Sequence, residues 1–215
     1  MNHDELVDAI SNGTIAMTQA LPEGGADKLA SLLEDLAYWS QRFNLTGIRE
    51  IPAMVSGHVM DSLSVRPYLQ GASVLDVGTG AGFPGLPLAI AEPARDFELL
   101  DGNGKKIGFV QRNITSLGIR NASARKVRAE NYAPGDRFDT VIARALTTIP
   151  QFIKLTSHLV KENGVLLALK GKYPAVELGK IPGNWEYTVS ELKVPGLESH
   201  ARHLVSLTRR QGSAA

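Results

Sequence analysis

Hydrophobic residues recur at steps of three and four through the first part of the chain. In the clearest run, the apolar positions are Leu29, Leu32, Leu33, Leu36, Trp39 and Phe43. This spacing is typical of one face of an amphipathic helix, and Asn44 and Gly47 mark its end. A second helix is predicted from Pro52 to Tyr68, with Gly57 at a point of close approach. Residues 1–70 are therefore predicted to form an N-terminal helical extension.

The pattern changes after residue 70, where short apolar runs alternate with helical stretches. Strands are predicted at 73–77, 97–101, 122–128, 138–143 and 164–169, with helices at 104–117 and 148–161. This order predicts a doubly wound, mostly parallel α/β sheet. Two alternating runs at 185–193 and 202–209, joined by Pro195-Gly196, add a C-terminal β-hairpin. The second part, residues 71–211, is thus predicted to hold a seven-stranded sheet and to form one compact unit with the extension.

The first predicted strand leads into a glycine-rich turn, with glycine at positions 78, 80 and 82. A dinucleotide fingerprint needs G-x-G-x-x-G, but Phe83 stands where the third glycine belongs. The G-K-[ST] ending of a P-loop is also missing, and Asp76 would repel a pyrophosphate. A nucleoside ligand that carries an ammonium group and no phosphate fits this turn better. We therefore expect S-adenosylmethionine as cofactor, on the sheet type of the methyltransferases that use it, bound by Asp76, Gly78, Gly80 and Gly82.

Further candidates follow the other predicted strands, because ligands in such sheets bind at the carboxyl ends of the strands. Asp101 can accept both ribose hydroxyls, or it is an ordinary turn residue before Gly102. Ala129 and Glu130 follow the third strand, where Glu130 can receive the adenine amino group or offset neighbouring arginines. Arg144 ends the fourth strand as a cation facing the cleft, or as an ion-pair partner of Asp139 or Glu162.

His58 and Asp61 stand three positions apart on the second predicted helix, close enough to share a face. Such a pair can act as a general base oriented by a carboxylate, or it can dock the helical extension on the sheet. We favour docking, with His58 and Arg144 as positioning residues. No metal site is expected, because His200 and His203 have no third ligand at useful spacing.

Charge along the 215-residue chain is uneven although the net charge is only +1. Residues 1–35 are acidic, and residues 102–129 carry only basic charges. The basic run starts directly after the expected cofactor site, which favours a phosphate-binding surface over a solvated helix face. The expected RNA-binding residues are Lys105, Lys106, Arg112, Arg125, Lys126 and Arg128.

The composition of the chain bears on where in the cell the protein acts. There is no cysteine, no apolar run long enough to cross a membrane, and no basic-then-apolar leader at the N-terminus. These features predict a cytoplasmic protein without membrane contact, and we expect a monomer.

Several segments together resemble the RsmG (GidB) family of methyltransferases, from about residue 35 to 207. The matching segments are Trp39-Ser-Gln-Arg-Phe-Asn-Leu-Thr, His58-Val-Met-Asp-Ser-Leu, Asp76-Val-Gly-Thr-Gly-Ala-Gly-Phe-Pro-Gly-Leu-Pro, Leu99-Leu-Asp, Lys105-Lys106, Arg144-Ala, Ala168-Leu-Lys-Gly-Lys and Arg202-His-Leu-Val. The resemblance implies methylation of a guanine at N7 in 16S ribosomal RNA, on naked rRNA or the small subunit. It also implies that Gly78, Phe83, Ala129, Glu130 and Arg144 line the cofactor site. Gly57 departs from the family, whose members commonly carry a basic residue there.

Guanine N7 has an in-plane lone pair and no proton to lose, so the implied reaction requires no catalytic base. Proximity and orientation then supply most of the acceleration. The alternatives are an NAD-dependent oxidoreductase, a methyltransferase of small molecules, and an RNA-binding module without activity.

Overall fold

A single seven-stranded sheet organises the protein, and its strand order is β3-β2-β1-β4-β5-β7-β6. The computed structural model describes residues 1–210. Strands β1 to β5 run parallel, whereas β7 is antiparallel to both β5 and β6. The strands are β1 Ser73–Val77, β2 Asp96–Asp101, β3 Ala122–Lys126, β4 Phe138–Arg144, β5 Val160–Lys170, β6 Trp185–Glu191 and β7 His203–Arg209. The predicted sheet class and its C-terminal hairpin are confirmed.

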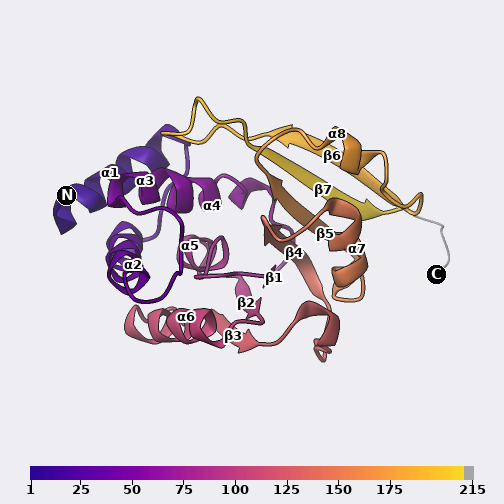
Figure 1. Ribbon diagram of the computed structural model, residues 1–215, viewed down its shortest axis with the longest axis horizontal. Helices are drawn as coiled ribbons and strands as arrows, with labels where there is room; N and C mark the ends of the chain where they lie inside the picture. The colour runs from indigo at the N-terminus through magenta and orange to yellow at the C-terminus, as the bar shows by residue number, and fades with distance from the viewer. Residues whose placement is uncertain (211–215) are drawn as a thin grey trace.

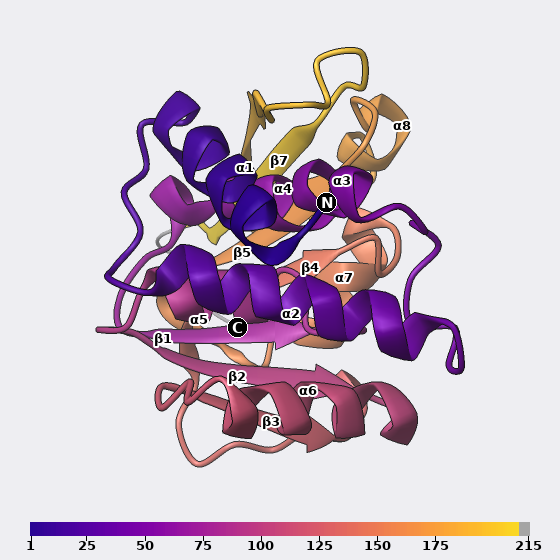
Figure 2. The ribbon, with the colours of Figure 1, turned by 90° about the vertical axis from the view of Figure 1, so that its left-hand side faces the viewer.

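The helices are α1 His3–Ala16, α2 Gly25–Ser40, α3 Ile51–Met54, α4 Asp61–Leu63, α5 Gly85–Ala91, α6 Gly104–Ser116, α7 Ile149–Thr156 and α8 Ala175–Leu178. Helices α5 and α6 cover one face of the sheet, and α7 and α8 lie on the other (Figure 1). In the perpendicular view, α2 lies in front of α5, whereas α1, α3 and α4 lie beside α5 toward β5 and β7 (Figure 2). The N-terminal helices therefore cover the same side of the sheet as α5 and α6.

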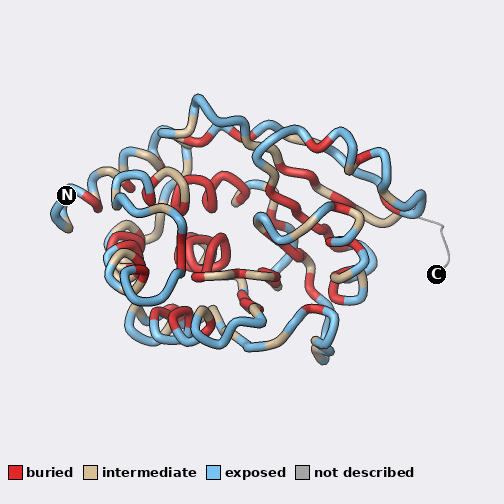
Figure 3. Tube along the Cα trace, in the orientation of Figure 1, coloured by how far each residue is buried: buried red, intermediate tan, exposed pale blue. Residues whose placement is uncertain are grey.

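Two apolar cores lie on opposite faces of this sheet. The first combines residues of the N-terminal helices, such as Leu29 and Leu36, with Leu86 of α5 and Phe109 of α6. The second packs α7 and α8 against β4, β5 and β7. The central strands are buried along most of their length (Figure 3), which suits parallel strands covered on both faces. Residues of both predicted parts, 1–70 and 71–211, contribute to the first core. The division of the chain into these two parts at residue 70 stays a prediction. The predicted end of the second part, residue 211, lies outside the described residues.

The second predicted helix, 52–68, is not one regular helix. It comprises α3, a π-helical turn at Val55–Met60, α4 and a 3-10 turn at Arg66–Tyr68. The apolar positions that helical periodicity assigns to its inner face, Met54, Val55, Val59 and Leu63, are all buried, but periodicity carries no signal for the wider turn. π-helical turns occur frequently at functional sites. This one contains Gly57, and a Cβ at that position would lie 2.5 Å from Ile48 Cδ1, as expected for a close approach.

Two predicted boundaries on the sheet are wrong. The helix predicted at 148–161 ends at Thr156, and β5 starts at Val160. Leu159 and Val160 continue the apolar spacing of the helix, but their side chains belong to the core beneath the sheet. The strand predicted at 122–128 ends at Lys126 because the chain turns there into a 3-10 segment, Ala129–Asn131. Within the described residues, no helix is long and apolar enough to cross a membrane.

Candidate cofactor site

The glycine-rich turn connects β1 to α5, and glycines 78, 80 and 82 all have positive φ. Asp76 anchors this turn from below, since its Oδ2 accepts hydrogen bonds from Thr79 Oγ1 at 2.6 Å and from the Gly85 amide at 2.8 Å. Burial raises the pKa of Asp76 to about 6, although these two donors oppose the shift. The carboxylate is fully buried. Asp76 therefore shapes the loop from within the protein.

A cavity of about 700 Å³ opens at the carboxyl ends of β1, β2 and β4. Five of the predicted cofactor residues line it: Gly78, Asp101, Ala129, Glu130 and Arg144. This volume lies within the ~300–1,000 Å³ of typical small-molecule sites. Gly80 adjoins the cavity, because a Cβ there would meet only Lys106 Nζ within 4 Å, at 3.9 Å. The structure thus brings together strand ends that are far apart in the sequence.

Asp101 holds the rim of this cavity through its backbone contacts. Its Oδ2 accepts a hydrogen bond from the Gly80 amide at 2.9 Å, and its Oδ1 accepts one from the Asn103 amide at 2.7 Å. An ionised carboxylate has about four lone-pair sites, so two remain for hydroxyl donors. Asp101 can therefore fix the glycine turn and still receive a ligand.

Four of the predicted cofactor residues are not among those that line the cavity: Gly80, which adjoins it, and Asp76, Gly82 and Phe83. A Cβ at Gly82 would lie 2.5 Å from Leu86 Cδ1, so this glycine permits close packing of the turn on α5. Phe83 is buried; its ring stacks on His58 at 4.7 Å, and the Arg144 guanidinium lies 5.7 Å from its centroid. Phe83 thus supports residues at the edge of the site.

Arg144 joins the end of β4 to the N-terminal helices. Its Nη1 donates to Asp61 Oδ2 and to the Gly57 carbonyl, each at 3.0 Å, and its Nη2 donates to His58 Nδ1 at 3.2 Å. Asp61 Oδ1 accepts a second guanidinium, from Arg202 Nε at 3.0 Å. The ion-pair partners considered for Arg144, Asp139 and Glu162, are therefore wrong, because Asp61 takes this role and Asp139 pairs with Lys161.

His58 does not form the carboxylate-oriented pair that its spacing allowed. Because an arginine only donates, His58 Nδ1 must accept, and the neutral ring then carries its proton on Nε2. His58 Nε2 donates to Thr46 Oγ1 at 2.7 Å. Burial, reinforced by the charge of Arg144, lowers the pKa of His58 to about 3. Both ring nitrogens are thus occupied, which favours docking of the helices over a base.

The predicted RNA-binding cations divide into two groups. Three of them contact carboxylates: Arg112 with Asp35 at 3.5 Å, Arg125 with Glu98, and Arg128 with Glu130 at 3.9 Å. The lysines at 105, 106 and 126 form no ion pair within residues 1–210. Lys106 and Arg128 also line the cavity, so part of the basic run borders the cofactor site.

Sequence reasoning missed two residues of this network, Thr46 and Arg202. Thr46 ends the Asn-Leu-Thr segment and Arg202 opens the Arg-His-Leu-Val segment, both of which carry the family resemblance. Their spacing from His58 and Asp61 gives no local signal, because the contacts form only in the folded chain. Their place in segments that carry the family resemblance was the available signal.

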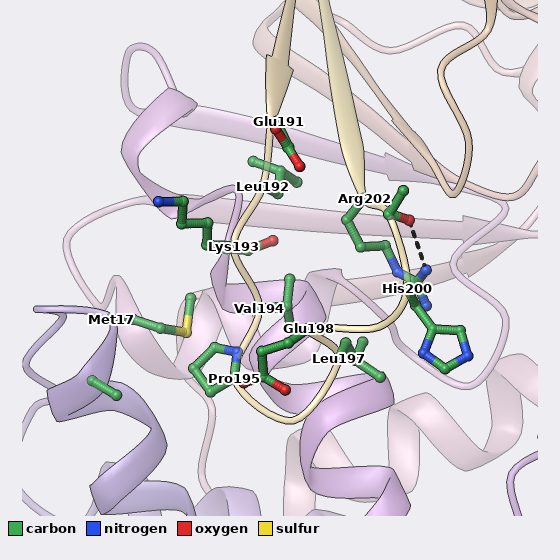
Figure 4. Close-up of a pocket in the computed structure, with 13 residues that line it drawn as sticks. Met17, Glu191, Leu192, Lys193, Val194, Pro195, Leu197, Glu198, His200 and Arg202 are labelled. Atoms are coloured by element: carbon green, nitrogen blue, oxygen red, sulfur yellow. Dashed lines mark hydrogen bonds between the residues drawn. The ribbon is translucent and has the colours of Figure 1, made fainter.

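A second cavity, of about 670 Å³, lies between the end of α1 and the segment that joins β6 to β7. Figure 4 shows Met17 just after α1, and Lys193, Glu198 and Arg202 on the segment that joins β6 to β7. Charges of both signs line it, and none of the predicted cofactor residues does. Arg202 therefore lies between this second cavity and the network around Asp61.

The sheet, its reversed last strand and the cavity at the glycine turn define an S-adenosylmethionine-dependent methyltransferase. Solved structures share the fold at low identity: a methyltransferase of this class from Aquifex aeolicus has a TM-score of 0.57 at 17% identity, covering 73% of this chain and 93% of that one. An rRNA methylase from Streptococcus thermophilus has a TM-score of 0.51 at 14% identity, covering 71% and 95%.

The chain belongs to the family rRNA small subunit methyltransferase G, whose model matches residues 26–205. It is similar to the Ribosomal RNA small subunit methyltransferase G of Legionella pneumophila, with 45% identity over 85% of this chain and 88% of the relative. The protein of that name from Alkalilimnicola ehrlichii is 39% identical over 100% of this chain and 97% of its own length. The family resemblance predicted from the sequence is confirmed, and an oxidoreductase is not favoured.

Proposed function

We propose that this protein transfers the methyl group of S-adenosylmethionine to N7 of a guanine in 16S ribosomal RNA. Membership of the rRNA small subunit methyltransferase G family supports the reaction class. The observation that carries the proposal is the cavity that gathers residues of three strand ends beside Lys106, which forms no ion pair within residues 1–210. The substrate is the rRNA itself or the small subunit, and we further propose a monomer that acts in the cytoplasm.

The residues around the cavity fit the proposed cofactor chemically. Asp101 retains lone pairs for the two ribose hydroxyls, and Glu130 lies where it can accept the adenine amino group. Gly80 leaves open space on the side where a Cβ would point. Arg144 and Lys106 supply positive charge for the carboxylate of the methionine moiety. When bound, S-adenosylmethionine supplies an electrophilic methyl group on a sulfonium.

The chain's own residues act by placing the acceptor. Guanine N7 attacks with its own lone pair, so no proton has to be removed. Consistent with this, the buried ring of His58 has both nitrogens engaged and a pKa of about 3. Arg144, fixed by Asp61 and the Gly57 carbonyl, stands at the strand end beside the cavity. Its fixed position helps to orient the reacting groups, and proximity and orientation together can supply ~7–11 kcal/mol of the barrier.

The test is transfer of a labelled methyl group from S-adenosylmethionine to small subunits and to purified 16S rRNA from a strain that lacks this protein. Methylation of guanine N7 makes the base labile to reduction, so strand cleavage at the product locates the nucleotide. We expect one site per rRNA, and no signal from the Gly80→Val variant. Label on another base or another atom of guanine would refute the proposal, as would reduction of NAD without methyl transfer.

A further inference from the structure

Aromatic and basic side chains interleave on the surface where the end of α2 meets α6. Arg42 lies over the Tyr38 ring at 5.3 Å, and Lys105 lies over Phe43 at 5.7 Å. Trp39 stacks on Phe43 at 5.8 Å with 17° between the planes. These five residues, which we term the aromatic surface, alternate rings with cations as single-stranded nucleic-acid sites do.

Part of this neighbourhood has a structural role that must be separated from binding. Arg112 lies over the Trp39 ring at 5.5 Å and pairs with Asp35 at 3.5 Å, so it joins α6 to α2. Trp39 itself is half-buried. By contrast, Tyr38 on α2 is 51% exposed, and Phe43, just beyond the end of α2, is 39% exposed. The outward members are thus free of the contact that holds the two helices together.

The charges on the outward side fit a polyanion. Arg42 and Lys105 form no ion pair within the described residues, and Asp35, the carboxylate beside the cluster, already pairs with Arg112. Both cations are exposed on long flexible side chains. They can therefore move from a ring to a phosphate while the ring accepts a base.

The aromatic surface also lies on the same edge of the sheet as the cofactor cavity. Helix α6 begins at Gly104, directly after β2 ends at Asp101, and its first turn carries two adjacent lysines. Lys106 lines the cavity, whereas Lys105 lies over Phe43. Figure 2 shows α2 and α6 side by side along the sheet. One turn of helix thus connects the site of methyl transfer to the exposed rings.

We propose that Tyr38 and Phe43 stack on unpaired bases of the rRNA next to the target guanine, while Arg42 and Lys105 hold the adjoining phosphates. This inference rests on the proposed function and names the surface that holds its substrate. A guanine in folded rRNA must be splayed out of its stack before its N7 can reach the cavity. Tyr38 and Phe43 would stack on the bases next to this guanine and replace the base stacking that is lost, which stabilises the RNA with the guanine splayed out.

The test uses the variant Tyr38→Leu/Phe43→Leu, which retains apolar volume but lacks both rings. The matched control is Tyr187→Leu, since Tyr187 is 45% exposed on β6 at the opposite edge of the sheet. Methyl transfer by the unaltered protein is measured first, and its absence would refute the proposed function itself. Base stacking is worth ~1–3 kcal/mol, so each lost stack should raise the KM for rRNA roughly 5- to 150-fold.

Two further readouts separate stacking from charge and from folding. The salt dependence of RNA binding should keep its slope, because no phosphate contact is lost, and affinity for S-adenosylmethionine should not change. An unchanged KM overturns the inference. So does an effect seen on assembled subunits but not on protein-free rRNA, which would indicate a ribosomal protein as partner.

A second measurement does not depend on the variant's folding. The unaltered protein is bound to 16S rRNA that contains 5-iodouridine and is then irradiated, which links the modified bases to stacked aromatic rings. We expect crosslinks in the peptide that contains residues 38–43. Crosslinks confined to other peptides would overturn the inference.

Discussion

Removal of the Asp61 side chain should destabilise the protein, because this carboxylate pairs with two arginines. Its side chain is 7% exposed and accepts hydrogen bonds from two guanidinium groups, Arg144 and Arg202, each at 3.0 Å. In Asp61→Ala the two cations remain close together without their shared anion. Removal of one partner from a buried ion pair costs about 3–5 kcal/mol.

The magnitude follows from the exposure of the two cations. The side chain of Arg144 is 19% exposed and that of Arg202 is 27% exposed, so water compensates each of them in part. We therefore expect Asp61→Ala to lower the free energy of unfolding by about 3 kcal/mol, at the lower end of that range. This is a large fraction of the ~5–15 kcal/mol typical of a folded protein.

Urea denaturation followed by circular dichroism measures this loss. Asp96→Ala is the matched control, because Asp96 is an exposed strand residue, and its effect should stay within about 0.5 kcal/mol. The double variant Asp61→Ala/Arg202→Ala should lose less than the sum of the single variants, since one of the repelling cations is gone. A loss below about 1 kcal/mol in Asp61→Ala, or strict additivity, would refute the assigned network.

Three further predictions concern the cofactor site and its surroundings. In Gly80→Val, calorimetry should detect no S-adenosylmethionine binding, because a φ of +61° strains a branched residue and the valine carbons would enter the open space beside the cavity. Gly108→Ala, on α6, is the control. His58 stays neutral in the folded state, whereas in the unfolded chain it takes up a proton below pH 6.5, so the free energy of unfolding decreases as the pH is lowered. Between pH 7 and pH 5, urea titrations should show that the unaltered protein loses about 2 kcal/mol more of this free energy than His58→Gln does. Equal losses would contradict the buried neutral ring. Lys105→Ala should lower the salt slope of RNA binding by ~0.7–0.9 and leave the affinity for S-adenosylmethionine unchanged. Lys106→Ala should lower the salt slope and also the affinity for S-adenosylmethionine, because Lys106 lines the cavity. Identical behaviour of the two variants would contradict the placement of these lysines.

The sheet could be predicted from the sequence because local patterns determine it. The strands β1, β2, β4 and β5 each contain an apolar run, and a glycine directly follows β1, β2 and β5, so these strand ends and candidate ligand residues can be located without a structure. The five predicted residues that line the cavity lie at the last position of a strand, as Asp101 and Arg144 do, or shortly after one. The boundary errors at 122–128 and 148–161 arose where apolar spacing continues across a change of element.

The connections between distant segments could not be predicted in the same way. Asp61 and Arg202 are 141 positions apart, and Thr46 contacts His58 across a loop that carries no periodicity. No sequence pattern predicts the π-helical turn at Val55–Met60 either, although the Gly57 carbonyl in this turn accepts a hydrogen bond from Arg144. Asp61 can pair with Arg144 and Arg202 only because the N-terminal helices pack next to the end of β4 and the start of β7. This arrangement depends on the packing of all the N-terminal helices and is not visible in the local sequence.

These contacts give the N-terminal helices a direct part in the site. The cavity is built from the sheet, but the orientation of Arg144 is set by Gly57, His58 and Asp61, all of which belong to the helical layer. If this layer shifts, Arg144 loses three acceptors at once and the end of β4 loses its fixed charge. A reaction that needs no proton transfer depends on such placement more than on any reactive side chain. The helices that carry the proposed RNA-stacking rings therefore belong to the same layer that fixes the cofactor side of the reaction, which couples substrate binding to the geometry of methyl transfer.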